Sequence, residues 1–411
     1  MGRPVAGRFV RRVAPDTCPP LASIPHACYT ARPVVRSQPH LLHVFSTFVP
    51  AGPETRTVRI IEALGHEFRH SIVAMDGRTD AKSLLSGKYD VSILDAPPRA
   101  GSWATMMALR KQFVAVKPTA ILSYNWGAFD AVFAARSLGF GRVVHHEDGF
   151  TSDESEEYKR RRVWARRFML PRVHKVVVPS RKLEGIATKL WKLKPAHVLC
   201  IPNGVALDRF APADGRPTLR HDLSIPKGRL VVGYCGHLRP EKNPLRFLKA
   251  CARIDREIDV HALILGDGPE RAACEELARS QPGLYGRVTF AGHVADPRAH
   301  YRAMDLFCVS SDTEQMPVAL VEAMASSLPV VSTDVGDVRA MLPDAQGEYV
   351  VPLEEHESAW PLAEKLTELL RDASKRKQLG AANRKVAEER YSFDAMLRAY
   401  RDVYQSVTSA R

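Results

Sequence analysis

The feature that most constrains the fold is a repeated alternation of short apolar runs with helical stretches, present in both halves of the chain. In the first half, the apolar run at residues 40–45 is followed by residues 56–64, in which Val58, Ile61 and Leu64 recur at helical spacing. Strands that alternate with helices favour a mostly parallel sheet with helices on both faces. The chain is therefore predicted to be an α/β protein with Rossmann-like units. Ligands of such sheets bind beyond the carboxyl ends of the strands.

The length of 411 residues predicts two domains, because a single hydrophobic core rarely serves so long a chain. We expect the first domain at residues 39–210 and the second at residues 211–390, followed by a helical segment at 391–411. The segment at residues 206–226 holds several prolines and glycines, as a linker would. The cleft between the two domains is the expected ligand site.

Residues 1–38 are rich in arginine and proline and show no periodicity. We expect a disordered basic arm, or a segment added by an upstream start codon. The arm lacks the apolar core of about 7 residues that a secretory signal needs, and no apolar run approaches the ~20 residues that span a bilayer. Seven scattered cysteines without a C-x-x-C pair disfavour a disulfide framework and a zinc site, and favour a reducing cytoplasmic setting.

Two of the strands predicted in the first half end in polar residues. The run SYNWG contains Asn125 and Trp126, and the run HHEDG contains His145, His146 and Asp148. Both runs fall where a parallel sheet binds its ligands. The alternative is a pair of polar loops satisfied by backbone groups.

The loop at residues 46–55 carries Gly52 between two prolines, directly after the first predicted strand. It is not the G-x-G-x-x-G fingerprint of dinucleotide-binding folds. The loop therefore predicts a wall for a phosphate or an acceptor, and a nicotinamide oxidoreductase is disfavoured.

A glycine turn followed by cations opens the second half of the chain. The apolar run at residues 230–234 leads into Gly236, His237, Arg239 and Lys242, and a helix is predicted to follow. A glycine turn, cations and a helix start together predict a cradle for a diphosphate.

A pair of glutamates flanks the start of a later helix, for which Pro317 is the predicted first residue. The free amides near Val318 make that helix end a site for an anion. Glu314 lies just before the helix, and Glu322 lies about 7–8 Å along its axis at ~1.5 Å per residue. The pair can bracket a ligand with an anionic middle and hydroxyls at both ends, which is the shape of a nucleotide-sugar. The alternative is two solvated charges at a helix end.

These segments together resemble the retaining glycosyltransferases of family GT4, which have the GT-B fold. The resemblance rests on E-x-x-P-x-x-x-x-E-A-M-A followed by LPVVSTDVGDV, on IPNGV at residues 201–205, on GDGP at 266–269 and on EKN at 241–243. It covers about residues 40–408 and is strongest in the second half. It implies two Rossmann-like domains whose parallel sheets face a central cleft, with the helix at 391–411 crossing back to the first domain.

The resemblance also implies roles for individual residues. Glu314 would position the sugar hydroxyls, Lys242 would stabilise the leaving phosphate, and Glu322 would hold the ribose. One of His145, His146 and Asp148 would contact the transferred sugar, a contact that a histidine suits at neutral pH. The residues implied to bind the donor are Gly236, His237, Arg239, Gly266, Asp267, Gly268, Val294, Met316, Pro317, Val318 and Glu322.

The chain departs from the family pattern at two positions. His237 stands where relatives usually carry an arginine, and a mostly neutral histidine cannot make the arginine fork. Either Arg239 reaches the phosphates instead, or His237 donates one hydrogen bond. Asp148 stands where many relatives carry a histidine. These departures keep open an inactive protein that binds nucleotide-sugars.

Family resemblance implies transfer with retention from a nucleotide-diphosphate-sugar to a saccharide or lipid-linked acceptor, as in polysaccharide or glycolipid biosynthesis. It implies no metal or other cofactor, and the absence of any D-x-D motif agrees. Other reactions on this fold, such as sugar-nucleotide epimerisation or phosphorolysis, are alternatives. The donor base, the sugar and the acceptor are not readable from the sequence.

The formal charge of +13 calls for an acidic partner. Residues 159–167, KRRRVWARR, combine cations with aromatic neighbours such as Phe168, which is typical of a helix that lies on an anionic membrane. The alternative is a solvated arginine face on a helix docked by its aromatic side. Nucleic acid is disfavoured, since no helix-turn-helix, zinc-finger or RNP-like pattern is present. We therefore expect a cytoplasmic protein that can attach to the inner face of the cytoplasmic membrane.

Overall fold

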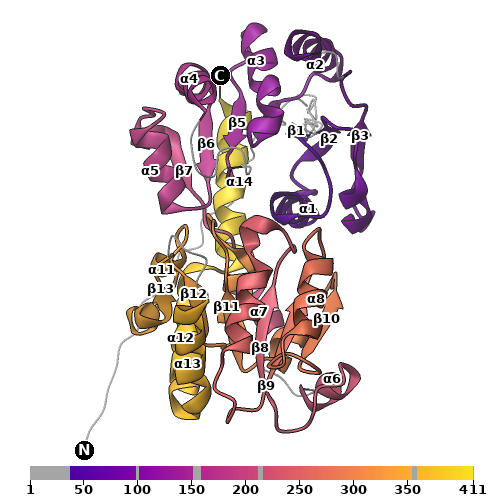
Figure 1. Ribbon diagram of the computed structural model, residues 1–411. Coiled ribbons are helices and arrows are strands. Elements are labelled where there is room, and N and C mark those ends of the chain that lie inside the picture. The colour runs from indigo at the N-terminus through magenta and orange to yellow at the C-terminus, as the bar shows by residue number, and fades with distance from the viewer. Residues whose placement is uncertain (1–37, 99–100, 151–158, 212–215, 354–358, 411) are drawn as a thin grey trace, which may run out of the picture. The chain divides into compact units, whose positions relative to one another are not determined.

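The computed structural model describes residues 38–98, 101–150, 159–211, 216–353 and 359–410. The predicted basic arm, residues 1–38, lies outside the described residues except for Gln38. The described chain contains two parallel sheets, each covered by helices on both faces (Figure 1). This arrangement confirms the predicted α/β fold class.

In the described residues, seven parallel strands form the sheet of the N-terminal lobe, in the order β3-β2-β1-β4-β5-β6-β7. Their bounds are β1 His40–Phe45, β2 Arg69–Ala74, β3 Val91–Leu94, β4 Ala120–Tyr124, β5 Val143–His146, β6 Lys175–Val178 and β7 Val198–Cys200. Strand β1, which lies between β2 and β4, is buried along its whole length, because both of its faces are covered.

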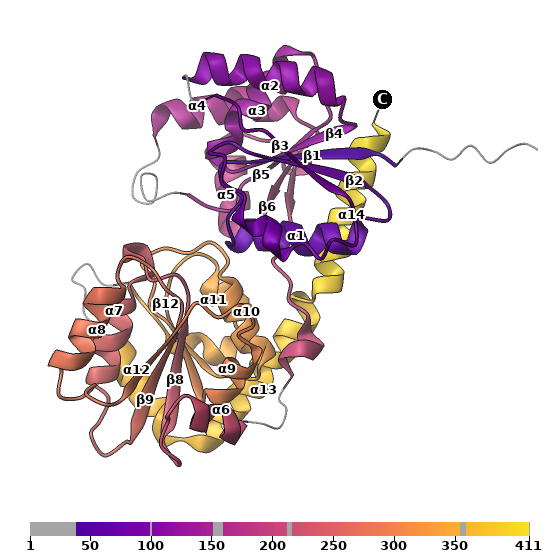
Figure 2. The ribbon, with the colours of Figure 1, turned by 90° about the vertical axis from the view of Figure 1, so that its right-hand side faces the viewer.

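Helices cover the two faces of this sheet unequally (Figure 2). One face packs against α1 Gly52–Leu64 and the last helix, α14 Phe393–Ser409. The other packs against α2 Ser102–Val116, α3 Phe129–Ser137, α4 Arg160–Met169 and α5 Arg181–Lys189. Helix α1 begins at Gly52 rather than at the predicted residue 56, because Pro53 suits a first turn.

The described part of the C-terminal lobe has a sheet of six parallel strands in the order β10-β9-β8-β11-β12-β13. The strands are β8 Leu230–Cys235, β9 Val260–Leu265, β10 Val288–Gly292, β11 Leu306–Val309, β12 Val330–Thr333 and β13 Val350–Val351. The helices are α6 Arg216–Asp222, α7 Pro244–Ala252, α8 Arg271–Ser280, α9 Arg298–Ala303, α10 Val318–Ala325, α11 Val338–Met341, α12 Trp360–Arg371 and α13 Ala373–Arg390.

The chain crosses between the lobes twice, and the two crossings are hydrogen-bonded to each other. The amide of Val205 donates to the carbonyl of Tyr391 at 2.9 Å, and the amide of Phe393 donates to the carbonyl of Val205 at 2.9 Å. After the second crossing, Met396, Tyr400 and further residues of α14 pack in the N-terminal core. The predicted boundary near residue 210 lies at the end of the first crossing.

Candidate active site

A cavity of about 860 Å³ opens where the carboxyl ends of strands from both lobes meet. Its walls come from loops that follow β1, β5 and β7 in one lobe, and β8, β9, β10 and β11 in the other. The predicted site residues that line it are Gly52, Asp148, Gly236, His237, Arg239, Lys242, Gly266, Asp267, Gly268, Val294, Glu314, Met316, Pro317 and Val318.

Residues 310–317, here called the acidic loop, connect β11 to α10. Glu314 Oε1 accepts hydrogen bonds from Lys242 Nζ at 2.6 Å and from Ser311 Oγ at 2.8 Å. Pro317 has an extended ψ of 119° and is the N-cap, so the helix begins at Val318 and the predicted helix start at Pro317 is wrong by one residue. The first-turn amides of α10 are those that a helix leaves unbonded at its positive end.

Glu322 lies inside the lobe beneath the start of α10, rather than on the cavity wall. Its Oε2 accepts a hydrogen bond from the Tyr301 hydroxyl at 2.9 Å. Burial raises the pKa of Glu322 to about 7, so the carboxyl is partly protonated at neutral pH.

Two glycine turns touch at the base of the cavity. Gly266 has a φ of +133°, and a Cβ placed there would lie 1.9 Å from the carbonyl oxygen of Gly236. A Cβ on Gly268 would lie 2.5 Å from His237 Nδ1. These close approaches require glycine, and the absence of side chains at these positions lets a phosphate lie close to the backbone.

His237 and Arg239 both line the cavity, but neither side chain is held in a buried position from which it could clamp a phosphate. Burial lowers the pKa of His237, and the nearby Arg239 lowers it further, so the imidazole is neutral at pH 7. Arg239 is about half exposed and lies 3.5 Å from Glu241. Lys242 is therefore the cation most firmly oriented in this wall, because Glu314 holds it.

Arg246, which was not among the predicted site residues, supports the acidic loop from behind. Arg246 is buried on α7, and its Nη1 donates to the carbonyl of Ser310 at 2.9 Å and pairs with Asp312 at 2.5 Å. An arginine on the apolar face of a predicted helix was the signal available in the sequence.

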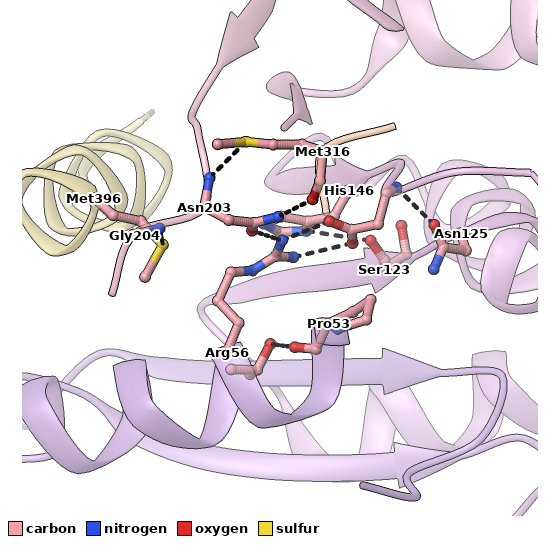
Figure 3. Close-up of polar contacts among 11 residues, drawn as sticks. Pro53, Arg56, Ser123, Asn125, His146, Asn203, Gly204, Met316 and Met396 are labelled. Atoms are coloured by element: carbon pink, nitrogen blue, oxygen red, sulfur yellow. Dashed lines mark hydrogen bonds and ion pairs between the residues drawn. The ribbon is translucent and has the colours of Figure 1, made fainter. Parts of the chain in front are cut away.

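The N-terminal wall holds a second charged pair, which joins the predicted Asp148 to an arginine outside the predicted site. Arg56 of α1 donates to both carboxylate oxygens of Asp148, at 2.5 and 3.0 Å, and to Asn203 Oδ1 at 3.0 Å. All three side chains line the cavity, and Figure 3 shows Arg56 rising from α1 toward Asn203. Asp148 is thus the member of the HHEDG run that faces the cavity.

His145 and His146 are fully buried in the N-terminal sheet, and the prediction that one of them contacts a ligand is not supported. Strand β5 stays paired with β6 through His146, so the chain reaches the cavity only two residues later. His145 Nδ1 lies 2.9 Å from Ser123 Oγ, and the His146 ring stacks on Tyr124 with centroids 4.4 Å apart. Burial, followed by Arg56, lowers the pKa of His146 to about 3.

Asn125 and Trp126 also lie behind the wall. Asn125 Oδ1 accepts the Asp148 amide at 2.7 Å and so fixes the backbone of the residue that faces the cavity. The Trp126 ring packs under the guanidinium groups of Arg162 and Arg166, at 5.1 and 5.0 Å. Both residues support the wall instead of lining it.

The fold and this cleft define a class: a GT-B protein whose C-terminal wall suits a nucleoside diphosphate. Two family models match the chain, "Glycosyltransferase Family 4" over residues 50–209 and "Glycosyl transferases group 1" over residues 229–372. The chain belongs to the GT4-type glycosyltransferases, as its sequence pattern predicted.

Among curated relatives, the chain is 26% identical to the UDP-Gal:alpha-D-GlcNAc-diphosphoundecaprenol alpha-1,3-galactosyltransferase of Escherichia coli, over 55% of this chain and 60% of that protein. It is 31% identical to the D-inositol 3-phosphate glycosyltransferase of Kineococcus radiotolerans, over 54% of each. The chain thus spans little more than half the length of these relatives.

Among solved structures, HepE of Anabaena, crystallised with UDP and glucose, superposes with a TM-score of 0.76. The match covers 90% of this chain and 100% of HepE at 19% identity, and it shows the GT-B fold. Within the part of the chain that the structure describes, no helix is long and apolar enough to cross a membrane. The same residues contain no group of three or more His, Cys, Asp or Glu side chains that could hold a metal ion.

Proposed function

We propose that the protein transfers a sugar from a nucleotide-diphosphate-sugar to a saccharide or lipid-linked acceptor, with retention of anomeric configuration and without a metal ion. The observation that carries this proposal is the meeting of Lys242, Glu314 and the start of α10 in one cavity of nucleotide-sugar size. The names of the relatives support it, since one uses UDP-Gal and another was crystallised with UDP and glucose.

The chemistry follows from the charges on the two walls. Lys242 and the α10 amides stabilise the negative charge that grows on the departing diphosphate, which is electrostatic catalysis by groups already in place. Glu314, held by Lys242 and Ser311, presents its second carboxylate oxygen to the sugar hydroxyls. The touching glycine turns give the diphosphate a close backbone surface.

Binding and turnover can be measured separately. Thermal unfolding with UDP, GDP and ADP identifies the base, because a ligand at 100 times its dissociation constant adds about 2.7 kcal/mol of stability. Release of the nucleoside diphosphate in the presence of acceptor sugars then reports transfer. Binding without release under all acceptors would favour the inactive alternative, and no stabilisation by any nucleotide would overturn the proposal.

We also propose that the protein acts at an anionic membrane surface on the cytoplasmic side, where lipid-linked acceptors lie. The observation that favours this partner is the orientation of α4. The helix packs on the sheet through Val163, Arg166 and Met169, whereas Trp164 and Phe168 are 66% and 62% exposed. The aromatic residues therefore face outward among arginines, which is the arrangement of an interfacial helix.

A further inference from the structure

The cavity wall of the N-terminal lobe is built around one buried arginine. Arg56 is 8% exposed, and it forms two parallel hydrogen bonds to Asp148, Nη1 to Oδ1 at 2.5 Å and Nη2 to Oδ2 at 3.0 Å. Such a fork fixes the plane of a carboxylate, which a lysine cannot do. The ring of Tyr400, from α14, lies 5.6 Å behind the guanidinium.

The same arginine is connected to the opposite lobe. Arg56 Nη1 also donates to Asn203 Oδ1, and Asn203 Nδ2 donates to the carbonyl of Met316 at 3.3 Å (Figure 3). The backbone N–H of Asn203 donates to the Met316 sulfur at 3.1 Å. Met316 belongs to the acidic loop, so a continuous chain of hydrogen bonds joins Asp148 in one wall to the loop that carries Glu314 in the other.

Asp148 is held at both its main chain and its side chain. Its amide donates to Asn125 Oδ1 at 2.7 Å, and its carboxylate is fixed by Arg56. The side chain is still 11% exposed and lines the cavity, so a ligand in the cavity can reach the carboxylate. A carboxylate is an acceptor only, and its natural partner in a ligand is a hydroxyl.

Charge decides which part of a nucleotide-sugar meets this wall. Lys242, the glycine turns and the α10 amides, which suit a phosphate, belong to the C-terminal lobe, whereas the Arg56 cation of the N-terminal wall is already paired with Asp148. A carboxylate in the N-terminal wall would repel a diphosphate. The part of the ligand that is uncharged and rich in hydroxyls is the transferred sugar.

Glu54, an acidic residue near Arg56, differs from Asp148 in its contacts and its pKa. Glu54 lies on the same turn of α1 and is as buried as Arg56, and burial raises its pKa to about 7. Burial would lower the pKa of Arg56, but the Asp148 carboxylate more than offsets this and raises it, so the guanidinium stays charged. Arg56 thus serves Asp148, and Glu54 provides a matched control.

We propose that Arg56 is a positioning residue, which holds Asp148 as the hydrogen-bond acceptor for a hydroxyl of the transferred sugar, and that Asn203 ties this arrangement to the acidic loop. The proposal rests on the glycosyl-transfer function above. It assigns the recognition of the nucleoside diphosphate to the C-terminal lobe and part of the recognition of the sugar to Arg56 and Asp148.

The test compares the affinity for a nucleotide-sugar with the affinity for the same nucleotide without its sugar. The probes are UDP and UDP-glucose, GDP and GDP-mannose, and ADP and ADP-glucose, titrated by calorimetry into the full chain. We expect Arg56→Gln to bind the nucleoside diphosphate within about 2-fold of the parent protein and to lose at least 10-fold in the ratio of nucleotide-sugar to nucleotide affinity. Arg56→Lys should recover part of this ratio, and Glu54→Gln should leave it unchanged.

Each result decides the proposal. An unchanged ratio in Arg56→Gln, or an equal loss in Glu54→Gln, would overturn the positioning role while leaving the proposed function intact. If no nucleotide bound the parent protein, the proposed function would fail first and this inference with it. Should Arg56→Gln fail to fold, Asn203→Ala removes one support of the same arginine, and it should lower the ratio in the same direction by a smaller factor.

Discussion

Two ion pairs between individual residues carry charge into the walls of the cavity. Lys242 pairs with Glu314 at 2.6 Å, and Arg56 pairs with Asp148 at 2.5 Å, one pair in each lobe. Pairing fixes the direction of each group before a ligand arrives, so little reorganisation is needed when charge develops. The two pairs therefore define the polar ends of the proposed site.

Replacement of Lys242 by alanine should reduce transfer by about 10²–10³-fold, because one preorganised group that stabilises developing negative charge contributes about that much. The fold should remain, since Glu314 keeps the Ser311 hydrogen bond. Initial rates of nucleoside diphosphate release and thermal unfolding measure the two effects. Lys385→Ala, an exposed lysine on α13, is the control. Full activity in Lys242→Ala would remove this residue from the proposed site.

The residues that sequence alone could predict were those whose partners lie in a local pattern. Glu314, Met316 and Pro317 belong to one short segment, and their place in the cavity wall follows from the strand, loop and helix around them. Arg56 and Asp148 are separated by 92 residues, and no local pattern joins them. His145 and His146 were misplaced because a sequence does not show how far a strand stays paired with its neighbour.

Helices and strands could be predicted where apolar runs were long, but the residues at which they begin and end could not. The run at residues 40–45 matches β1 in full, whereas α1 begins earlier than its apolar periodicity suggested. The reason is that a first helical turn needs no apolar contacts when Pro53 fixes the backbone. Loop and turn geometry, which sets the site, depends on close approaches such as that between Gly236 and Gly266.

At the turn after β9, Gly266→Ala should destabilise the protein by about 2–4 kcal/mol and abolish nucleotide binding. The added Cβ would lie 1.9 Å from the Gly236 carbonyl oxygen, so the two turns must separate. Gly286→Ala is a matched control, because its φ is also positive at +69° but nothing lies within 4 Å of the new Cβ. The control should cost only about 1–2 kcal/mol and keep nucleotide binding. Denaturant unfolding and calorimetry check both variants, and equal losses would contradict a steric cause.

Helix α4 should carry the membrane affinity. Trp164→Ser combined with Phe168→Ser should strongly weaken binding to vesicles that contain anionic lipid, since these rings are the apolar contact. Replacing exposed arginines, as in Arg160→Gln and Arg161→Gln, should weaken the free energy of vesicle binding by about 1 kcal/mol for each arginine. The same changes should reduce the dependence of vesicle binding on salt concentration.

Vesicle co-sedimentation measures this binding, with uncharged lipid as the reference. Trp360→Ser is the matched control, because Trp360 is 63% exposed on α12 of the other lobe. Equal binding to charged and uncharged vesicles by the parent protein would count against the membrane proposal. An effect of Trp360→Ser as large as that of the α4 variants would place the contact elsewhere.

For the whole molecule, the alternation of strands and helices was enough to predict two parallel sheets, and the motifs were enough to predict the GT-B class. The sequence could not show which polar groups the cores enclose. The N-terminal core contains His43, His70 and His146, and the C-terminal lobe buries His261, all at 3% exposure or less. Histidines scattered along strands resemble surface residues until the packing of both sheet faces is known.

These buried histidines should make the folded protein sensitive to acid. Burial lowers the pKa of His70 to about 4, of His146 to about 3 and of His261 to about 4, and lowers that of His43 well below its usual value. In the unfolded chain each titrates near 6.5. Between about pH 6.5 and 4 the unfolded state therefore binds more protons than the folded state, and stability falls as the pH is lowered.

Two carboxyl groups oppose this trend. Glu54 and Glu322 have pKa values raised to about 7, so the folded state binds more protons at these two groups between pH 4.5 and 7. Among these six groups, four histidines against two carboxyls leave a net uptake of about two protons on unfolding between pH 6.5 and 4.5. The pKa values of His40, His174, His237 and His300 are also lowered by burial, which acts in the same direction. The free energy of unfolding should then fall by roughly 2–3 kcal/mol per pH unit over that range.

Denaturant unfolding at pH 7.5, 6.5, 5.5 and 4.5 measures this slope. His146→Phe keeps the aromatic ring against Tyr124 and removes one titrating group, so it should reduce the slope by about 1.4 kcal/mol per pH unit. A free energy of unfolding that stays constant from pH 7.5 to 4.5 would mean that these imidazoles are protonated in the folded core. A core that held them protonated would need acidic partners beside them, whereas His43 has His70 at 3.0 Å and the Tyr124 hydroxyl at 3.0 Å.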